Sequence, residues 1–185
     1  MNMVIRNSKL VDAENGRFTV LDIVTLQLSG PFIWQGKDIN EAKAKGSAFF
    51  AYEPDDPNEK KVSVATITVA DVTLDPSEPD VSTLNEADVS NIDAYLRSEI
   101  QKQVSHDGDE IGHWMGSHLN QSEQIKGLVT AYTLQEFEKV TQYIDLRITI
   151  GGRKFFLNGN FDISKKDQLA GLVYGVLSNV VVDLR

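Results

Sequence analysis

The 185-residue chain carries 27 Asp and Glu against 18 Lys and Arg, which gives a formal net charge of -9. Such a chain repels phosphate backbones and anionic lipid headgroups, which argues against nucleic-acid binding and membrane-surface binding. The sequence contains no cysteine, so thiol nucleophiles, zinc-thiolate sites and disulfide frameworks are excluded.

The first predicted elements are strands followed by a short helix. Residues 17–28 are rich in β-branched side chains, which predicts one or two strands. A two-turn helix is expected next, because Asp38 and Glu41 form a D-x-x-E capping pattern and Gly46 suits the C-terminal end.

A pair of strands is predicted on either side of an acidic, proline-containing loop. Residues 47–52 and 60–74 have the composition of strands, and 53–59 has that of a solvated hairpin loop. The apolar phase changes after Val69, which predicts a bulge or bend within the second strand.

After a polar connector at 75–82, an amphipathic helix is predicted. Thr83 and Glu86 have the spacing of a capping box at its start. Its apolar face recurs at three- and four-residue steps and consists of Val89, Ile92, Leu96 and Ile100.

Three consecutive antiparallel strands are predicted at 128–137, 141–150 and 153–162. The middle strand alternates clearly, with Ile144, Leu146, Ile148 and Ile150 on a core face. Its other face is expected to be wet and carries Tyr143, Asp145, Arg147 and Thr149. Gly151 and Gly152 supply the positive φ values of a tight hairpin turn.

The chain ends in a predicted core helix, capped by Ser164 and Asp167, with an apolar period near 3.6 residues. Gly171 and Gly175 within it predict a close approach to a strand or a helix. We therefore expect one α+β domain over 1–185. Its antiparallel sheet of about six strands would be covered by two long helices in an α/β/α-type sandwich.

The C-terminal hairpin and helix resemble a known superfamily. In residues 145–182, a small-residue turn precedes Gly152, Arg153 and Phe155, and a further strand and a terminal helix with an apolar tail follow. This order resembles the PsbP-like and DcrB-like proteins, although the chain ends differently from the serine-then-basic ending of that family. The resemblance implies the fold of that superfamily.

The superfamily is largely non-enzymatic, so the resemblance implies no catalytic residues. Its members include a subunit of the photosynthetic oxygen-evolving complex, nuclear import factors, envelope lipoproteins and adaptor chaperones of type VI secretion effectors. Immunity proteins of toxin systems are similar in size and charge. The resemblance thus implies a protein that presents a surface to a protein partner.

Residues 106–118, HDGDEIGHWMGSH, hold all three histidines and have the residue types of a metal site. The spacing of His106, His113 and His118 does not place two imidazoles on one helical face, and the stretch fails the calcium-loop pattern. We interpret it as a polar connector without a metal or another cofactor, in which these histidines remain weak candidate ligands.

No nucleophile elbow, dinucleotide-binding motif or phosphate-binding loop occurs in the sequence. Large aromatic, methionine and arginine side chains in loops or on the wet sheet face are candidate partner contacts, because such residues anchor interfaces. These candidates are Trp34, Trp114, Met115, Tyr143 and Arg147. The alternative is that both tryptophans cap the core.

We expect a non-enzymatic immunity protein that neutralises a secreted bacterial toxin of the type VI secretion or polymorphic kind with a basic surface. One alternative is an adaptor chaperone that shields apolar helices of an effector. The other is a metal-dependent hydrolase that uses the histidine-rich stretch. No run of about 20 apolar residues occurs, which predicts a cytoplasmic protein, or a periplasmic one if a native leader is missing.

Overall fold

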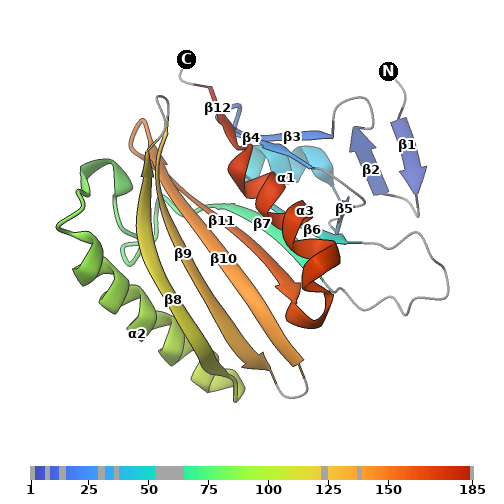
Figure 1. The fold of residues 1–185 in the computed structure, drawn as a ribbon. Coiled ribbons are helices and arrows are strands. Elements are labelled where there is room, and N and C mark those ends of the chain that lie inside the picture. The colour runs from blue at the N-terminus through green and yellow to red at the C-terminus, as the bar shows by residue number, and fades with distance from the viewer. Residues whose placement is uncertain are drawn as a thin grey trace.

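The computed structural model has an α+β fold built on a curved antiparallel sheet (Figure 1). It describes residues 3–6, 9–12, 16–28, 32–35, 38–52, 65–121, 125–136 and 139–183. Seven strands form the large sheet, in the order β5-β6-β7-β11-β10-β9-β8. They are β5 (Phe32–Trp34), β6 (Ser47–Tyr52), β7 (Ala65–Asp71), β8 (Glu110–Gln121), β9 (Lys126–Glu136), β10 (Lys139–Ile150) and β11 (Arg153–Asp162).

Two smaller sheets accompany the large one. The first pairs β1 (Met3–Arg6) with β2 (Lys9–Asp12). The second has the order β12-β4-β3 and contains β3 (Arg17–Val20), β4 (Val24–Gln27) and β12 (Val181–Val182). The prediction of two strands in 17–28 is therefore confirmed, and Leu21 and Asp22 form the tight turn between them with positive φ values.

Three α-helices are present in the described part of the chain, with lengths of 7, 19 and 13 residues. They are α1 (Ile39–Lys45), α2 (Val89–Asp107) and α3 (Lys166–Ser178). The expected α+β class and antiparallel sheet are confirmed. The large sheet has seven strands where about six were expected, and the two expected long helices are only part of its cover, since the short α1 and the small sheets add to it.

The N-terminal cap of α1 is as predicted, but those of α2 and α3 are not. The Asp38 side chain accepts hydrogen bonds from two backbone N–H groups of α1, and Gly46 ends the helix with φ 68°. Short 3-10 turns, η1 (Val81–Thr83) and η2 (Ile163–Lys165), precede α2 and α3 and carry their own Asp caps. The later helices then begin without a side-chain capping bond.

The two long helices lie on opposite faces of the large sheet (Figure 1). We call these the α2 face and the α3 face. On the α2 face, Leu96 and Ile100 of the helix belong to the clusters that contain Leu128, Tyr132 and Leu134 of β9. On the α3 face, the helix packs with β3 and β4 over the larger core. Burial of each such side chain contributes about 1.5–3 kcal/mol.

Strand β10 alternates as predicted, but the face that we expected to be wet is covered. Ile144 and Ile148 are buried on the α3 face, and Asp145 and Arg147 are buried on the opposite face. The segment before α2 covers them, since Glu78 pairs with Arg147 and the backbone N–H of Val81 bonds to Thr149.

Two further predictions about strands are settled by the pairing. Strand β7 ends at Asp71 and pairs without a register shift, so Val72 and Leu74 lie beyond it and the expected bulge is absent there. Gly151 and Gly152 both have positive φ and confirm the hairpin between β10 and β11. The loop predicted at 53–59 lies outside the described residues.

The stretch 106–118 is not a connector. Gly108, with φ 85°, ends α2, and the residues from Glu110 onward form β8. The strand escaped prediction because it lies at the sheet edge and because two bulges, at 111–113 and 114–116, interrupt its alternation. None of the helices in the described ranges is long and apolar enough to cross a membrane.

Candidate functional site

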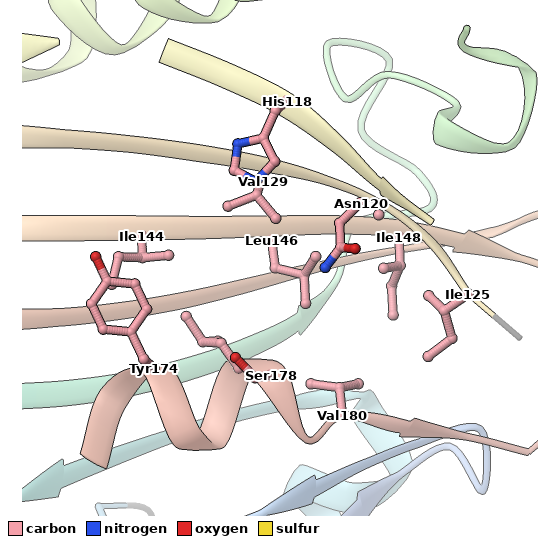
Figure 2. A pocket seen from close by; sticks show the side chains of 12 residues that line it. His118, Asn120, Ile125, Val129, Ile144, Leu146, Ile148, Tyr174, Ser178 and Val180 are labelled. Carbon is pink, nitrogen blue, oxygen red and sulfur yellow. The ribbon is translucent and has the colours of Figure 1, made fainter. Parts of the chain in front are cut away.

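An apolar pocket of about 290 Å³ lies on the α3 face, between α3 and strands β8, β9 and β10 (Figure 2). Its floor is formed by alternate residues of β10, namely Ile144, Leu146 and Ile148, with Val129 of β9 beside them. These branched aliphatic side chains are the ones that sequence periodicity assigned to the core. Here, part of this core face opens into the pocket.

The pocket exists because α3 lies towards the other half of the sheet. The helix packs on β11 and β7, where Gly159 of β11 allows it to come close. A Cβ atom at Gly159 would lie 2.5 Å from Val173 Cγ1 and 3.0 Å from Leu177 Cδ1. With α3 held there, the α3 face over β8–β10 is only partly covered.

A second glycine gives the pocket its depth. Gly127 of β9 is buried, and a Cβ atom there would lie 2.7 Å from Leu146 Cδ1. Any larger residue at this position would press on the floor of the pocket.

Polar side chains stand around the aliphatic floor. His118 and Asn120 come from β8, and Tyr174 and Ser178 come from α3 (Figure 2). Tyr174 also makes an edge contact with the Phe161 ring. Among the described residues, the lining contains no Asp, Glu, Lys or Arg, so the pocket suits an uncharged apolar group with a few polar atoms near its mouth.

The predicted partner residues are dispersed over the molecule. Trp34 is 5% exposed in the large core, so it offers little surface to a partner. Met115 is 49% exposed on β8, and its sulfur lies 3.7 Å from Gln142 Nε2. Met115 is therefore the predicted contact residue that is most accessible on the surface.

Trp114 and Tyr143 belong to a stack of three rings on the α2 face. Tyr132 lies between them, with ring centroids 5.5 Å from Trp114 and 5.3 Å from Tyr143. The indole Nε1 of Trp114 donates to the Asp93 carboxylate of α2 at 3.0 Å. These contacts fix α2 to the sheet and give Trp114 and Tyr143 a structural role.

Tyr143 also holds a carboxylate at the end of the stack. Its hydroxyl donates to Glu136 at 2.8 Å, and Thr141 donates to the same side chain. Burial opposes ionisation of Glu136, but these hydrogen bonds outweigh it and lower the pKa of the carboxyl.

Arg147 lies within a buried polar network. Its guanidinium lies 2.9 Å from Glu78 and 3.5 Å from Asp145, so two carboxylates share one cation. Asn158 donates to Asp145 at 2.7 Å. Burial raises the pKa of the Asp145 carboxyl, against the opposing effects of Arg147 and Asn158.

The three histidines do not converge. His106 lies in the last turn of α2, His113 is exposed on β8, and His118 lines the pocket. No group of three or more potential metal-ligating side chains occurs among the residues that the structure describes.

The sequence did not reveal the pocket, because its position depends on where α3 lies across the sheet. The available signal was Gly159, a buried glycine within a strand that otherwise alternates regularly. The polar residues Tyr174 and Ser178, on a helix that is otherwise apolar on this side, were the second signal.

Together, the curved antiparallel sheet, the helices on its two faces and the partly covered apolar floor define an α+β sandwich with one open face.

No family model matches the sequence, and no curated protein matches it. Solved structures do match. The cyanobacterial PsbP (CyanoP) of Synechocystis sp. PCC 6803 is 13% identical, with a TM-score of 0.59 over 90% of this chain and 91% of that chain.

A second match is the Ran-binding protein Mog1p of Saccharomyces cerevisiae. It is 10% identical, with a TM-score of 0.52 over 91% of this chain and 95% of that chain. The chain therefore has the PsbP-like fold, as the C-terminal hairpin and helix predicted.

Proposed function

We propose that this chain is a non-catalytic protein-binding protein whose partner inserts an apolar group into the pocket between α3 and β8–β10. The observation that carries the proposal is the pocket lining, which is aliphatic on its floor, polar at its mouth and free of charged residues. A lining of this kind binds by excluding water from apolar surface and by orienting the ligand with a few polar groups. A protein of the same fold, Mog1p, is a Ran-binding protein, which adds support.

Within this class, we propose an immunity protein that neutralises a bacterial toxin of the type VI secretion or polymorphic kind. The net charge of -9 favours a basic partner, because opposite charge speeds encounter and disfavours wrong partners. The toxin would be held without any chemical step, by burial of one of its apolar groups in the pocket.

The second candidate is an adaptor chaperone for a secreted effector. The aliphatic floor favours it, because Ile144, Leu146 and Ile148 could shield an apolar segment of the effector from water before secretion.

Co-expression with the product of the adjacent gene tests the proposal. An immunity protein is expected to form a stable complex and to restore growth of cells that express an active toxin. An effector chaperone would raise the soluble yield of its partner without rescuing growth. If the adjacent product neither co-purifies nor changes in toxicity or solubility, both functions are contradicted.

Two variants of α3 connect the outcome to the pocket. Ser178→Trp places an indole at the pocket mouth, where Ser178 is exposed and lines the pocket. Lys166→Trp places the same group at the opposite, exposed end of the helix. The first is expected to lose complex formation, and the second to retain it.

A further inference from the structure

The outer edge of β8 is unpaired among the described residues, since β8 is the last strand of the large sheet (Figure 1). Its two bulges lie at 111–113 and 114–116. From Gly116 to Gln121, the strand pairs residue by residue with β9. This part of the edge is therefore a regular template for another strand.

The regular part of the edge borders the pocket. His118 and Asn120, two alternate residues of β8, point to the α3 face and line the pocket (Figure 2). A strand added to β8 would lie about 4.8 Å away and would direct every second side chain to the same face. Those side chains would stand next to His118 and Asn120, at the β8 side of the pocket.

The size of the pocket favours side chains over a whole helix. A helix with its side chains is about 10–12 Å across, and a cavity of about 150 Å³ accommodates one benzene molecule. The pocket of about 290 Å³ therefore suits one or two aliphatic side chains. With no charged residue in its lining, it selects uncharged ones.

The opposite side chains of an added strand would face a strongly acidic region. Residues 75–110, which include α2 and lead into β8, hold ten acidic and two basic side chains, a net charge of -8 out of the -9 of the chain. Helix α2 packs on the α2 face of β8, and Asp93 lies 3.8 Å from where a Cβ of Gly116 would be. Basic side chains are favoured on this side.

We infer that the partner segment is an extended strand in which aliphatic and basic side chains alternate, and that it pairs with residues 116–121 of β8. The aliphatic side chains pack against His118 and Asn120 at the β8 side of the pocket, and the basic ones face the acidic region. The backbone hydrogen bonds supply affinity, and the side chains on the two faces of the added strand supply specificity. A second copy of this chain is a poorer occupant, because β8-to-β8 pairing would bring two regions of charge -8 together. This inference rests on the proposed function.

A short synthetic peptide in which lysine and valine alternate tests the inference with the intact protein. Amide and methyl NMR spectra are recorded as the peptide is added up to about 1 mM. The expected result is saturable binding, with shifts in 116–121 of β8 and in the methyl groups of Val129, which lies opposite His118 on β9. A peptide with glutamate in place of lysine is expected to bind at least about tenfold more weakly.

N-methylated peptides isolate the strand pairing without altering the protein. Two versions carry methyl groups on alternate sets of amides, so that only one set faces β8. One version is expected to lose binding at least about tenfold and the other to retain it. Equal binding by both versions, absence of binding, or a β8-mediated dimer seen by sedimentation would each overturn the inference.

Failure of strand pairing can be distinguished from failure of the proposed function. If the adjacent gene product binds and Ser178→Trp abolishes that complex, but the peptides show no dependence on N-methylation, the pocket function stands and strand pairing is wrong. A partner that enters the pocket as a helix would give this pattern.

Discussion

Adding one methyl group to Gly159 of β11 is predicted to destabilise the protein by forcing α3 away from the sheet. The new Cβ in Gly159→Ala would lie 2.5 Å from Val173 Cγ1 and 3.0 Å from Leu177 Cδ1, much closer than van der Waals contact. All three residues are buried, so the contact can be relieved only by moving the helix or its neighbours. Overpacking of this kind costs about 1–3 kcal/mol.

The reduced freedom of the unfolded chain returns up to about 1 kcal/mol of this cost. We therefore expect a net loss of about 1–2 kcal/mol in the free energy of unfolding, measured from urea unfolding curves with an unchanged slope. For a chain of this size, the loss corresponds to a Tm lower by about 2–8 °C.

Gly171 of α3 provides the matched control. It is exposed, and no heavy atom lies within 4 Å of a Cβ built there. Gly171→Ala is expected to stabilise the protein by about 0.5–1 kcal/mol, because glycine within a helix is unfavourable. If Gly159→Ala is as stable as the unaltered protein, or if both substitutions have the same sign, the packing argument is refuted.

Three other predictions concern the α2 face. Asp145→Asn is expected to raise the midpoint of urea unfolding at pH 7. Burial raises the pKa of this carboxyl in the fold, so the stability that the protonated group contributes is lost as pH rises through that pKa. The gain from the substitution should therefore vanish towards acid pH, and a loss of stability at pH 7 would contradict this reasoning. Tyr143→Phe removes a hydrogen bond to Glu136 and should lower the free energy of unfolding by about 1 kcal/mol at pH 7. Because the pKa of Glu136 is lowered in the fold, the stability that this bond contributes is lost as pH falls. A cost that does not change with pH would contradict this role of the bond. Trp114→Phe keeps a ring in the stack but loses the hydrogen bond to Asp93. Urea unfolding should show a loss of about 1 kcal/mol for this variant and of about 3 kcal/mol for Trp114→Ala. Equal losses would show that the hydrogen bond, and not the ring stack, dominates.

Most of the fold could be predicted from the sequence, because most of its elements bury one regular face. The alternation of β10 and the 3.6-residue period of α3 each match burial on one side of an element. The Asp38 cap and the Gly151–Gly152 turn depend on a few neighbouring residues only, and both were found correctly.

The failures have physical causes of a different kind. Strand β8 is an edge strand with two bulges, so its apolar residues follow no simple period. Asp145 and Arg147 are polar but buried, because Glu78 arrives from a segment nearly seventy residues away and completes their network. Local sequence cannot show such a partner, so the strand face was taken as wet.

Close packing was predicted at Gly171 of α3, but no heavy atom lies within 4 Å of a Cβ built there. The close contact between α3 and the sheet is at Gly159 of the facing strand β11 instead. A glycine in a helix and one in a strand both allow close approach, and only the tertiary structure shows which is used. The pocket follows from this choice, because the line along which α3 packs decides how much of β8–β10 stays open.

We propose above that the pocket between α3 and β8–β10 receives the protein partner. Methyl NMR spectra of Ile144, Leu146 and Ile148, recorded during addition of the adjacent gene product, test it most directly, together with the affinities of Ser178→Trp and Lys166→Trp. We expect shifts in these pocket methyl groups, lost affinity for Ser178→Trp and unchanged affinity for Lys166→Trp. Shifts confined to methyl groups of the α2 face, with equal affinity for both variants, would contradict it.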